Sequence, residues 1–79
     1  MATRHPERYR EMLNRLKAAR LERGLTQSDV ATVLGESQQW FSLVEIGSRR
    51  LDPLELAELA EIYQYPIEHF IPPEPKRRR

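Results

Sequence analysis

The fold is decided by residues 24–47, which read GLTQSDVATVLGESQQWFSLVEIG. Within them, Thr26 is followed three residues later by Asp29, a capping-box pattern with aspartate in place of the usual glutamate, and this predicts the start of a short helix. Gly35, which adopts the left-handed backbone conformation easily, is the expected end of that helix. Its buried side is expected to consist of apolar residues, namely Val30, Ala31, Val33 and Leu34.

A second short helix is predicted over 38–46, with Ser37 as its cap and Gly47 after its end. At about 100° per residue, this helix places Phe41 and Val44 on one apolar side, which we expect to be buried. The opposite side carries no charged residue, which is unusual for a helix in water and suits the edges of DNA bases. Two short helices joined by three residues are the layout of a helix-turn-helix, whose second helix enters the major groove.

Longer helical patterns flank this segment. A first helix is predicted from about Pro6 to Arg23, and another opens on Asp52 as its cap with Pro53 at its first position. The residues that these two helices direct to the core are expected to be Tyr9, Met12, Leu13, Leu16 and Ala19, and then Leu56, Leu59, Ala60 and Tyr63. Because no segment alternates at a period of two, an all-α fold is predicted, with a last helical turn over 67–71.

Length and composition exclude several classes of protein. The 79 residues hold at most one small domain, and the lack of cysteine excludes disulfides and thiolate metal sites. No apolar run approaches the roughly 20 residues that span a bilayer, so a membrane protein is excluded. The first residues lack the apolar stretch of a signal peptide, so a cytoplasmic location is expected.

The formal net charge of +1 is unevenly distributed. Residues 1–23 carry seven basic and three acidic groups, whereas residues 51–75 carry six acids and no lysine or arginine. One part of the domain can therefore face an anion while another repels it, although solvated helix faces explain the same pattern. The basic segment 76–79 would either contact the phosphates of a nucleic acid or only increase the solubility of the chain.

A wider pattern between residues 13 and 71 is carried by an ordered set: Gly24-Leu25-Thr26-Gln27, Leu34-Gly35, Ser37-Gln38-Gln39, Phe41-Ser42, Glu45, Gly47, Arg49-Arg50-Leu51-Asp52, Glu55-Leu56 and Ala60. This set resembles the Xre-type, or Cro/lambda-repressor-like, helix-turn-helix regulators. The resemblance implies a compact five-helix, lambda-repressor-like DNA-binding domain of bacterial or phage origin, usually a homodimer on a palindromic operator. The chain departs from the family after the fourth helix, where Gln64 and Tyr65 stand in place of a frequent glycine and a small apolar residue.

The predicted base contacts lie on the uncharged side of the helix over 38–46. Glutamine can bond both N6 and N7 of adenine, and leucine offers apolar contact to a thymine methyl group. The residues assigned to bases are therefore Gln38, Gln39, Ser42 and Leu43, with Ile46 as a further apolar candidate. The alternative for either glutamine is a bond to phosphate alone.

The predicted phosphate contacts flank the same helix: Thr26, Gln27, Ser37, Ser48, Arg49 and Arg50. For the Thr26-Gln27 pair this role is what the resemblance implies, and Thr26 also has a role as a helix cap. The arginines have an alternative as well, in which one of the two forms a surface ion pair with Asp52 or Glu55.

Other residues are expected to serve the structure. Glu45 lies between the buried and outward sides of its helix and is predicted to point into the domain, where the family pattern suggests Arg20 as its ion-pair partner. Trp40 is expected to be a partly buried packing residue. By family analogy the dimer contact falls on a cluster that would equally close the core: Tyr63, Tyr65, Phe70 and Ile71.

The sequence thus predicts a helix-turn-helix DNA-binding domain over residues 1–71 and a disordered, proline-rich basic tail over 72–79. The expected partners are double-stranded DNA and a second copy of the chain, and the expected function is that of a small repressor. The alternative is a protein-interaction module or antitoxin component on the same fold. No catalytic constellation, metal-ligand spacing or phosphate-binding loop occurs, so we expect neither an enzyme nor a cofactor.

Overall fold

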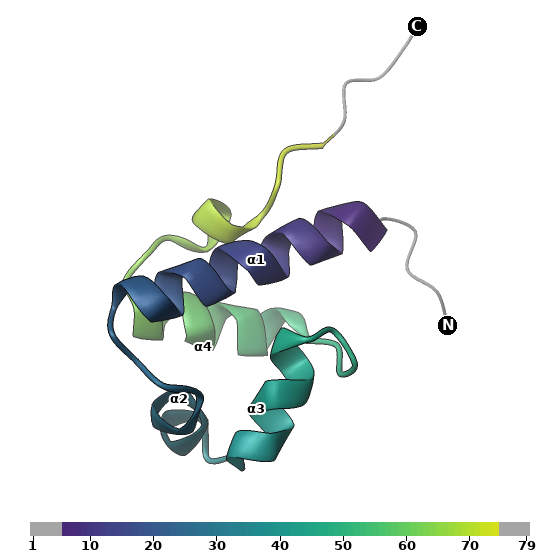
Figure 1. Cartoon of the computed structure of the whole chain (residues 1–79). Helices are drawn as coiled ribbons and strands as arrows, with labels where there is room; N and C mark the ends of the chain where they lie inside the picture. Colours follow the sequence, from purple (N-terminus) through teal and green to yellow (C-terminus); the bar gives the residue numbers. More distant parts are fainter. Residues whose placement is uncertain (1–5, 75–79) are drawn as a thin grey trace, which may run out of the picture.

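The computed structural model describes residues 6–74, which form four α-helices and one turn of 3-10 helix (Figure 1). The elements are α1 (Pro6–Glu22), α2 (Gln27–Leu34), α3 (Gln38–Glu45), α4 (Pro53–Tyr63) and η1 (Ile67–Phe70). No strand occurs within 6–74, so the predicted all-α class is confirmed. None of the helices in this part of the chain has the length and apolar character needed to cross a membrane.

The predicted count of five helices is wrong for the described residues, because the last element is a single 3-10 turn. Pro66 precedes that turn and Pro72 follows shortly after it, and the residue before a proline is driven out of the α conformation. Ile71 accordingly has extended backbone angles, φ −94° and ψ 112°. Only four residues are left between these constraints, which is room for one turn.

Local capping sets the starts of α2, α3 and α4 as the sequence predicts. The Thr26 hydroxyl accepts a hydrogen bond from the Asp29 N–H (3.0 Å), and the Asp29 carboxylate accepts one from the Thr26 N–H (2.9 Å). These bonds, the one to the Thr26 backbone first, hold the pKa of Asp29 below its usual value. Asp52 and Glu55 form the same reciprocal capping box at the start of α4, and the Ser37 hydroxyl caps α3 by accepting a hydrogen bond from the Trp40 N–H. Residues 27 and 38 are therefore fixed as the first residues of their helices.

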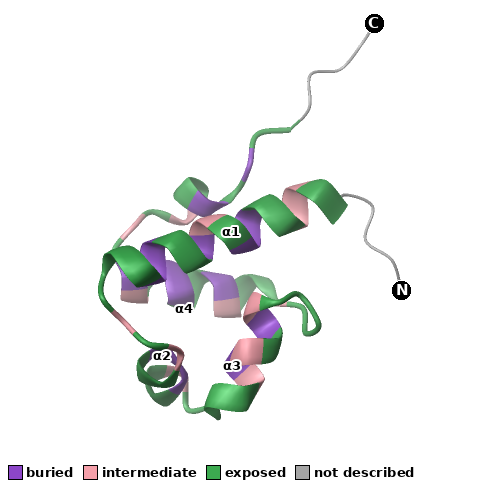
Figure 2. Ribbon diagram, in the orientation of Figure 1, coloured by how far each residue is buried: buried purple, intermediate pink, exposed green. Residues whose placement is uncertain are grey.

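The core lies where α1 packs against α4, with η1 against both and the paired helices α2 and α3 completing it (Figure 2). Most of the predicted core residues are buried: Met12, Leu13, Leu16, Ala19, Val30, Ala31, Phe41, Val44, Leu56, Leu59, Ala60 and Tyr63. Tyr9 and Leu34 are half-buried, and Val33 is exposed over 67% of its surface. At about 100° per residue it lies well off the Val30–Ala31 side that faces the core, so its predicted burial is wrong.

The aromatic residues at the C-terminal end close the core. Tyr63 and Phe70 are fully buried, with ring centroids 6.2 Å apart in an edge-to-face arrangement, and burial raises the pKa of the Tyr63 phenol. Because their side chains are enclosed within one chain, neither can contribute to the dimer contact predicted there. Tyr65 is half-buried, and Ile71 is 41% exposed.

The chain beyond η1 stays attached to α1. Pro72 is buried, and its carbonyl accepts a hydrogen bond from the Arg8 guanidinium (2.6 Å). In Figure 1 this segment leaves the molecule on the side of α1 opposite to α2 and α3. The rest of the predicted tail, 75–79, lies outside the described residues.

One non-glycine residue within 6–74 has a positive φ. Gln64, the C-cap of α4, has φ 62° and ψ 46°, so it adopts the left-handed conformation in which a β-carbon is crowded by the backbone. Its N–H bonds the carbonyls of Ala60 and Glu61, so the conformation is required to end the helix.

Replacing Gln64 with glycine should therefore stabilise the domain. The variant Gln64→Gly removes the β-carbon from a left-handed position, and we expect a gain of about 1 kcal/mol in the free energy of unfolding. For a domain of this size that gain raises the melting temperature by roughly 4–8 °C in calorimetry or circular dichroism. Gln64→Ala is the control, because it removes the side-chain amide but keeps the β-carbon. A melting temperature that rises equally in both variants, or in neither, contradicts the explanation.

Candidate nucleic-acid interface

Helix α3 presents the uncharged face that its sequence predicts. Phe41 and Val44 are 1% exposed and face the core. On the other side Gln38 and Gln39 are exposed, and Leu43 is 40% exposed. The outward side is completed by Ser42, which is half-buried, and Ile46, the C-cap, which is 65% exposed. The outer face of α3 is therefore a strip of amides, one hydroxyl and two branched apolar side chains.

A buried ion pair joins α3 to α1. The Arg20 Nε lies 2.7 Å from Glu45 Oε2, and Arg20 Nη2 lies 3.1 Å from Glu45 Oε1, so the contact is bidentate. Only 8% of the Arg20 side chain and 7% of the Glu45 side chain are exposed. The hydrogen bonds that Arg20 donates to Glu45 raise the pKa of Arg20 above its usual value, and the third guanidinium nitrogen donates to the Leu25 carbonyl (2.9 Å). The end of α3 is thereby fixed in one orientation on α1.

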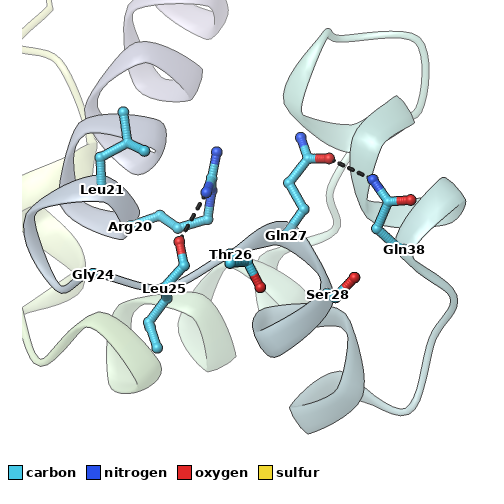
Figure 3. A pocket seen from close by; sticks show the side chains of 8 residues that line it. All are labelled: Arg20, Leu21, Gly24, Leu25, Thr26, Gln27, Ser28 and Gln38. Atoms are coloured by element: carbon cyan, nitrogen blue, oxygen red, sulfur yellow. Dashed lines mark hydrogen bonds between the residues drawn. The ribbon is translucent and has the colours of Figure 1, made fainter.

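The ion pair continues into a chain of side-chain hydrogen bonds that ends on the surface. Gln27 Nε2 donates to Glu45 Oε1 (2.8 Å), and Gln38 Nε2 donates to Gln27 Oε1 (2.7 Å; Figure 3). A carboxylate only accepts hydrogen bonds, so the NH2 group of Gln27 must face Glu45 and its carbonyl must face Gln38. Gln38 then keeps its own carbonyl oxygen and its second N–H, neither of which bonds another described residue. This donor and acceptor belong to an exposed side chain at the first residue of α3.

Sequence reasoning did not find the bond between Gln27 and Gln38, although a signal for it was present. The caps Thr26 and Ser37 make both glutamines the first residues of neighbouring helices. In a helix-turn-helix those two helix starts lie close together, so their side chains are within reach of each other. A hollow of about 470 Å³ opens beside them (Figure 3). It is lined by Arg20, Leu21, Gly24, Leu25, Thr26, Gln27, Ser28 and Gln38.

The loop after α3 carries two arginines, each held against an aromatic ring. The Arg49 guanidinium lies 5.1 Å from the Trp40 ring centroid and 3.8 Å from the Glu55 carboxylate, so the surface ion pair left open by the sequence is formed by Arg49. The Arg50 guanidinium lies 4.2 Å from the Tyr9 ring centroid. Both arginines and Ser48 are exposed, so their charge stays on the surface beside the C-terminal end of α3.

Tyr9 has a second role that its place in the apolar stripe of α1 did not reveal. It is half-buried, and its hydroxyl accepts a hydrogen bond from the Leu51 N–H (3.0 Å). One tyrosine thus holds the backbone of the loop between α3 and α4 while its ring supports Arg50. The remaining predicted site residue, Tyr65, lies elsewhere: its hydroxyl donates to Glu22 (2.6 Å) and its ring stacks on His69.

Within residues 6–74, no three histidine or acidic side chains gather as a metal-binding group.

A comparison with models of protein families matches residues 11–69 to the model described as "Helix-turn-helix domain". No curated protein matches the chain.

Neutralising Glu45 should destabilise the fold. Glu45→Gln leaves the Arg20 charge buried without its counter-charge, and breaking a buried pair in this way costs about 3–5 kcal/mol. Thermal or urea unfolding measures the loss. Glu58→Gln on the exposed side of α4 is the matched control and should change stability by less than about 0.5 kcal/mol. Equal melting temperatures for the wild type and Glu45→Gln would show that the pair does not hold α3.

Proposed function

Because this chain belongs to the helix-turn-helix domain family, we propose that it is a transcriptional regulator that binds a specific sequence of double-stranded DNA through α3. One observation carries the proposal. Gln38 stands at the exposed start of α3 with a free donor and acceptor, and it is held there by Gln27 and the buried Glu45. A polar side chain fixed on the surface by a chain of bonds from the core is prepared to bind another molecule.

The face of α3 suits the major groove. The free carbonyl and N–H of Gln38 form the pair that adenine N6 and N7 require. We assign Gln39 the same chemistry, Ser42 a single hydrogen bond to a base edge, and Leu43 contact with a thymine methyl group. Each is a proposal supported by exposure on this strip. The expected half-site therefore contains adenines followed by a thymine.

Phosphate contacts at both ends of α3 would orient it. The eight residues of α3 span about 12 Å, which matches the width of the major groove, so its two ends face opposite phosphate backbones. We assign one backbone to the residues around the start of α2 and α3, namely Thr26, Gln27 and Ser37. The other backbone is assigned to Ser48, Arg49 and Arg50.

We further propose that the protein acts as a homodimeric repressor on a palindromic operator. Two-fold symmetry would place two copies of α3 one helical turn of DNA apart, and occupation of such a site blocks polymerase. Of the residues first assigned to the dimer contact, the exposed Ile71 and the half-buried Tyr65 remain available for it.

A protein-interaction module is the second candidate, favoured by the exposure of Leu43 and Ile46 on the same face. The dependence of binding affinity on salt concentration distinguishes a DNA-binding regulator from a protein-interaction module. A protein that neutralises phosphates releases counterions, so its affinity for duplex DNA falls steeply as salt rises. Selection of bound sequences from a random duplex library, followed by titration of the selected duplex in increasing salt, tests the proposed function directly. A purified chain that binds no duplex at low salt refutes it.

Removing the amides of α3 should reduce discrimination between sequences. Gln38→Ala and Gln39→Ala are each expected to lower the ratio of specific to nonspecific affinity about tenfold, since a bidentate base contact contributes about 1–3 kcal/mol of discrimination. Fluorescence anisotropy with the selected duplex and a scrambled one measures the ratio. Gln64→Ala, at the end of α4, is the control and should leave it unchanged. An unchanged ratio in both α3 variants means that these residues bond phosphate only.

Removing an arginine after α3 should have a different effect. Arg49→Ala and Arg50→Ala are each expected to weaken binding to selected and scrambled duplexes alike, and to lower the slope of log affinity against log salt by about 1. The same anisotropy titrations, repeated over several salt concentrations, give both quantities. Loss of affinity for the selected duplex alone would contradict a role in phosphate contact.

A further inference from the structure

A second recess lies at the end of α3 opposite to the hollow beside Gln38. It is a groove of about 180 Å³ between the first turns of α1 and the turn after α3. Its walls combine apolar groups of Tyr9, Leu13 and Ile46 with the guanidinium groups of Arg10 and Arg50. The groove is therefore lined by both apolar side chains and two cationic ones.

We propose that this groove binds the sugar–phosphate backbone of DNA, and that Arg10 of α1 is a phosphate contact within it. The inference rests on the proposed function, and it extends the interface from the helix-turn-helix to the N-terminal half of α1. A nucleic-acid strand alternates an anionic phosphate with an apolar deoxyribose face, which matches this combination of cations and apolar side chains.

The position of the groove relative to α3 favours DNA as its occupant. The hollow of about 470 Å³ includes Gln38, the first residue of α3, and the groove includes Ile46, the C-cap of α3. The two recesses thus adjoin opposite ends of one short helix. If α3 lies across the major groove in the proposed complex, each of its ends is near one phosphate backbone, and each recess would then face one backbone.

The two cations of the groove differ in how they are held. Arg50 is placed by the Tyr9 ring, and Tyr9 is itself tied to the Leu51 N–H. Arg10 is exposed and forms no hydrogen bond or ion pair with another described residue. A fixed cation next to an unengaged one suits an extended anion, because Arg10 can adjust to a phosphate without breaking a bond inside the protein.

The test compares Arg10→Ala with Lys17→Ala. Both replace an exposed cation on α1, but Lys17 lies two turns further along the helix and does not line the groove. Affinity for the selected and the scrambled duplex is measured over a range of salt concentrations. We expect Arg10→Ala to weaken binding to both duplexes about five- to tenfold and to lower the salt slope by about 0.9, the value for one lost phosphate contact. Lys17→Ala should change the slope by less than half as much, and the melting temperatures of both variants should equal that of the wild type.

A neutral methylphosphonate linkage, placed in turn at each backbone position of the selected duplex, identifies the phosphate involved. At that position wild-type affinity should fall, and Arg10→Ala should cause no further loss. If Arg10→Ala binds as the wild type does, or if Lys17→Ala has an equal effect, the groove is not part of the interface, while the proposed function stands. If the wild type itself shows no salt-dependent binding to any duplex, the proposed function fails and the assignment of the groove fails with it.

Discussion

The pairing of Arg20 with Glu45 is the constraint on which the rest of the interface depends. An eight-residue helix has almost no stability by itself, so α3 takes its orientation from tertiary contacts. Phe41 and Val44 supply burial, which has no direction, whereas the bidentate ion pair fixes the rotation of α3 relative to α1. Removing two charges from water is costly, and here the cost is offset by the further bonds to the Leu25 carbonyl and the Gln27 amide.

Gln27 connects the buried ion pair to the surface by hydrogen bonds. Its amide is oriented by the Glu45 carboxylate, and its carbonyl in turn orients Gln38. Ordering a free glutamine side chain on binding would cost about 0.5–1.5 kcal/mol. Because these bonds already order Gln38 in the folded domain, binding does not incur that cost. Tyr9 has the same effect at the other end of α3, where it holds both the loop backbone and Arg50. Rigid polar groups therefore flank both ends of the proposed reading helix.

Local features could be predicted from the sequence, whereas contacts between distant residues could not, apart from the Arg20–Glu45 ion pair that the family resemblance suggested. The caps at Thr26, Ser37 and Asp52 act within three residues, so their residue types alone located the helix starts. Burial was harder to predict, because Val33 is apolar but lies off the core side of a two-turn helix. The contacts that shape the site join residues 11 to 42 positions apart, such as Gln38 with Gln27 and Leu51 with Tyr9. Periodicity says which side of a helix is apolar, and it says nothing about which side chain of another element will meet it.

The low net charge has a physical consequence for such a protein. Nonspecific affinity for DNA grows with the number of phosphates neutralised, and it is reduced where acidic residues nearly balance the basic ones, as the net charge of +1 shows that they do here. The exposed acids Glu58 and Glu61 on α4 repel phosphate from another side of the domain, so binding in a wrong orientation is disfavoured. With little affinity supplied by charge alone, the proposed base contacts from the strip on α3 would make up a larger share of the binding free energy. A small domain of low net charge would thus reach a high ratio of specific to nonspecific binding, provided that its polar contacts are held rigidly, as the bonds from Glu45 through Gln27 hold Gln38.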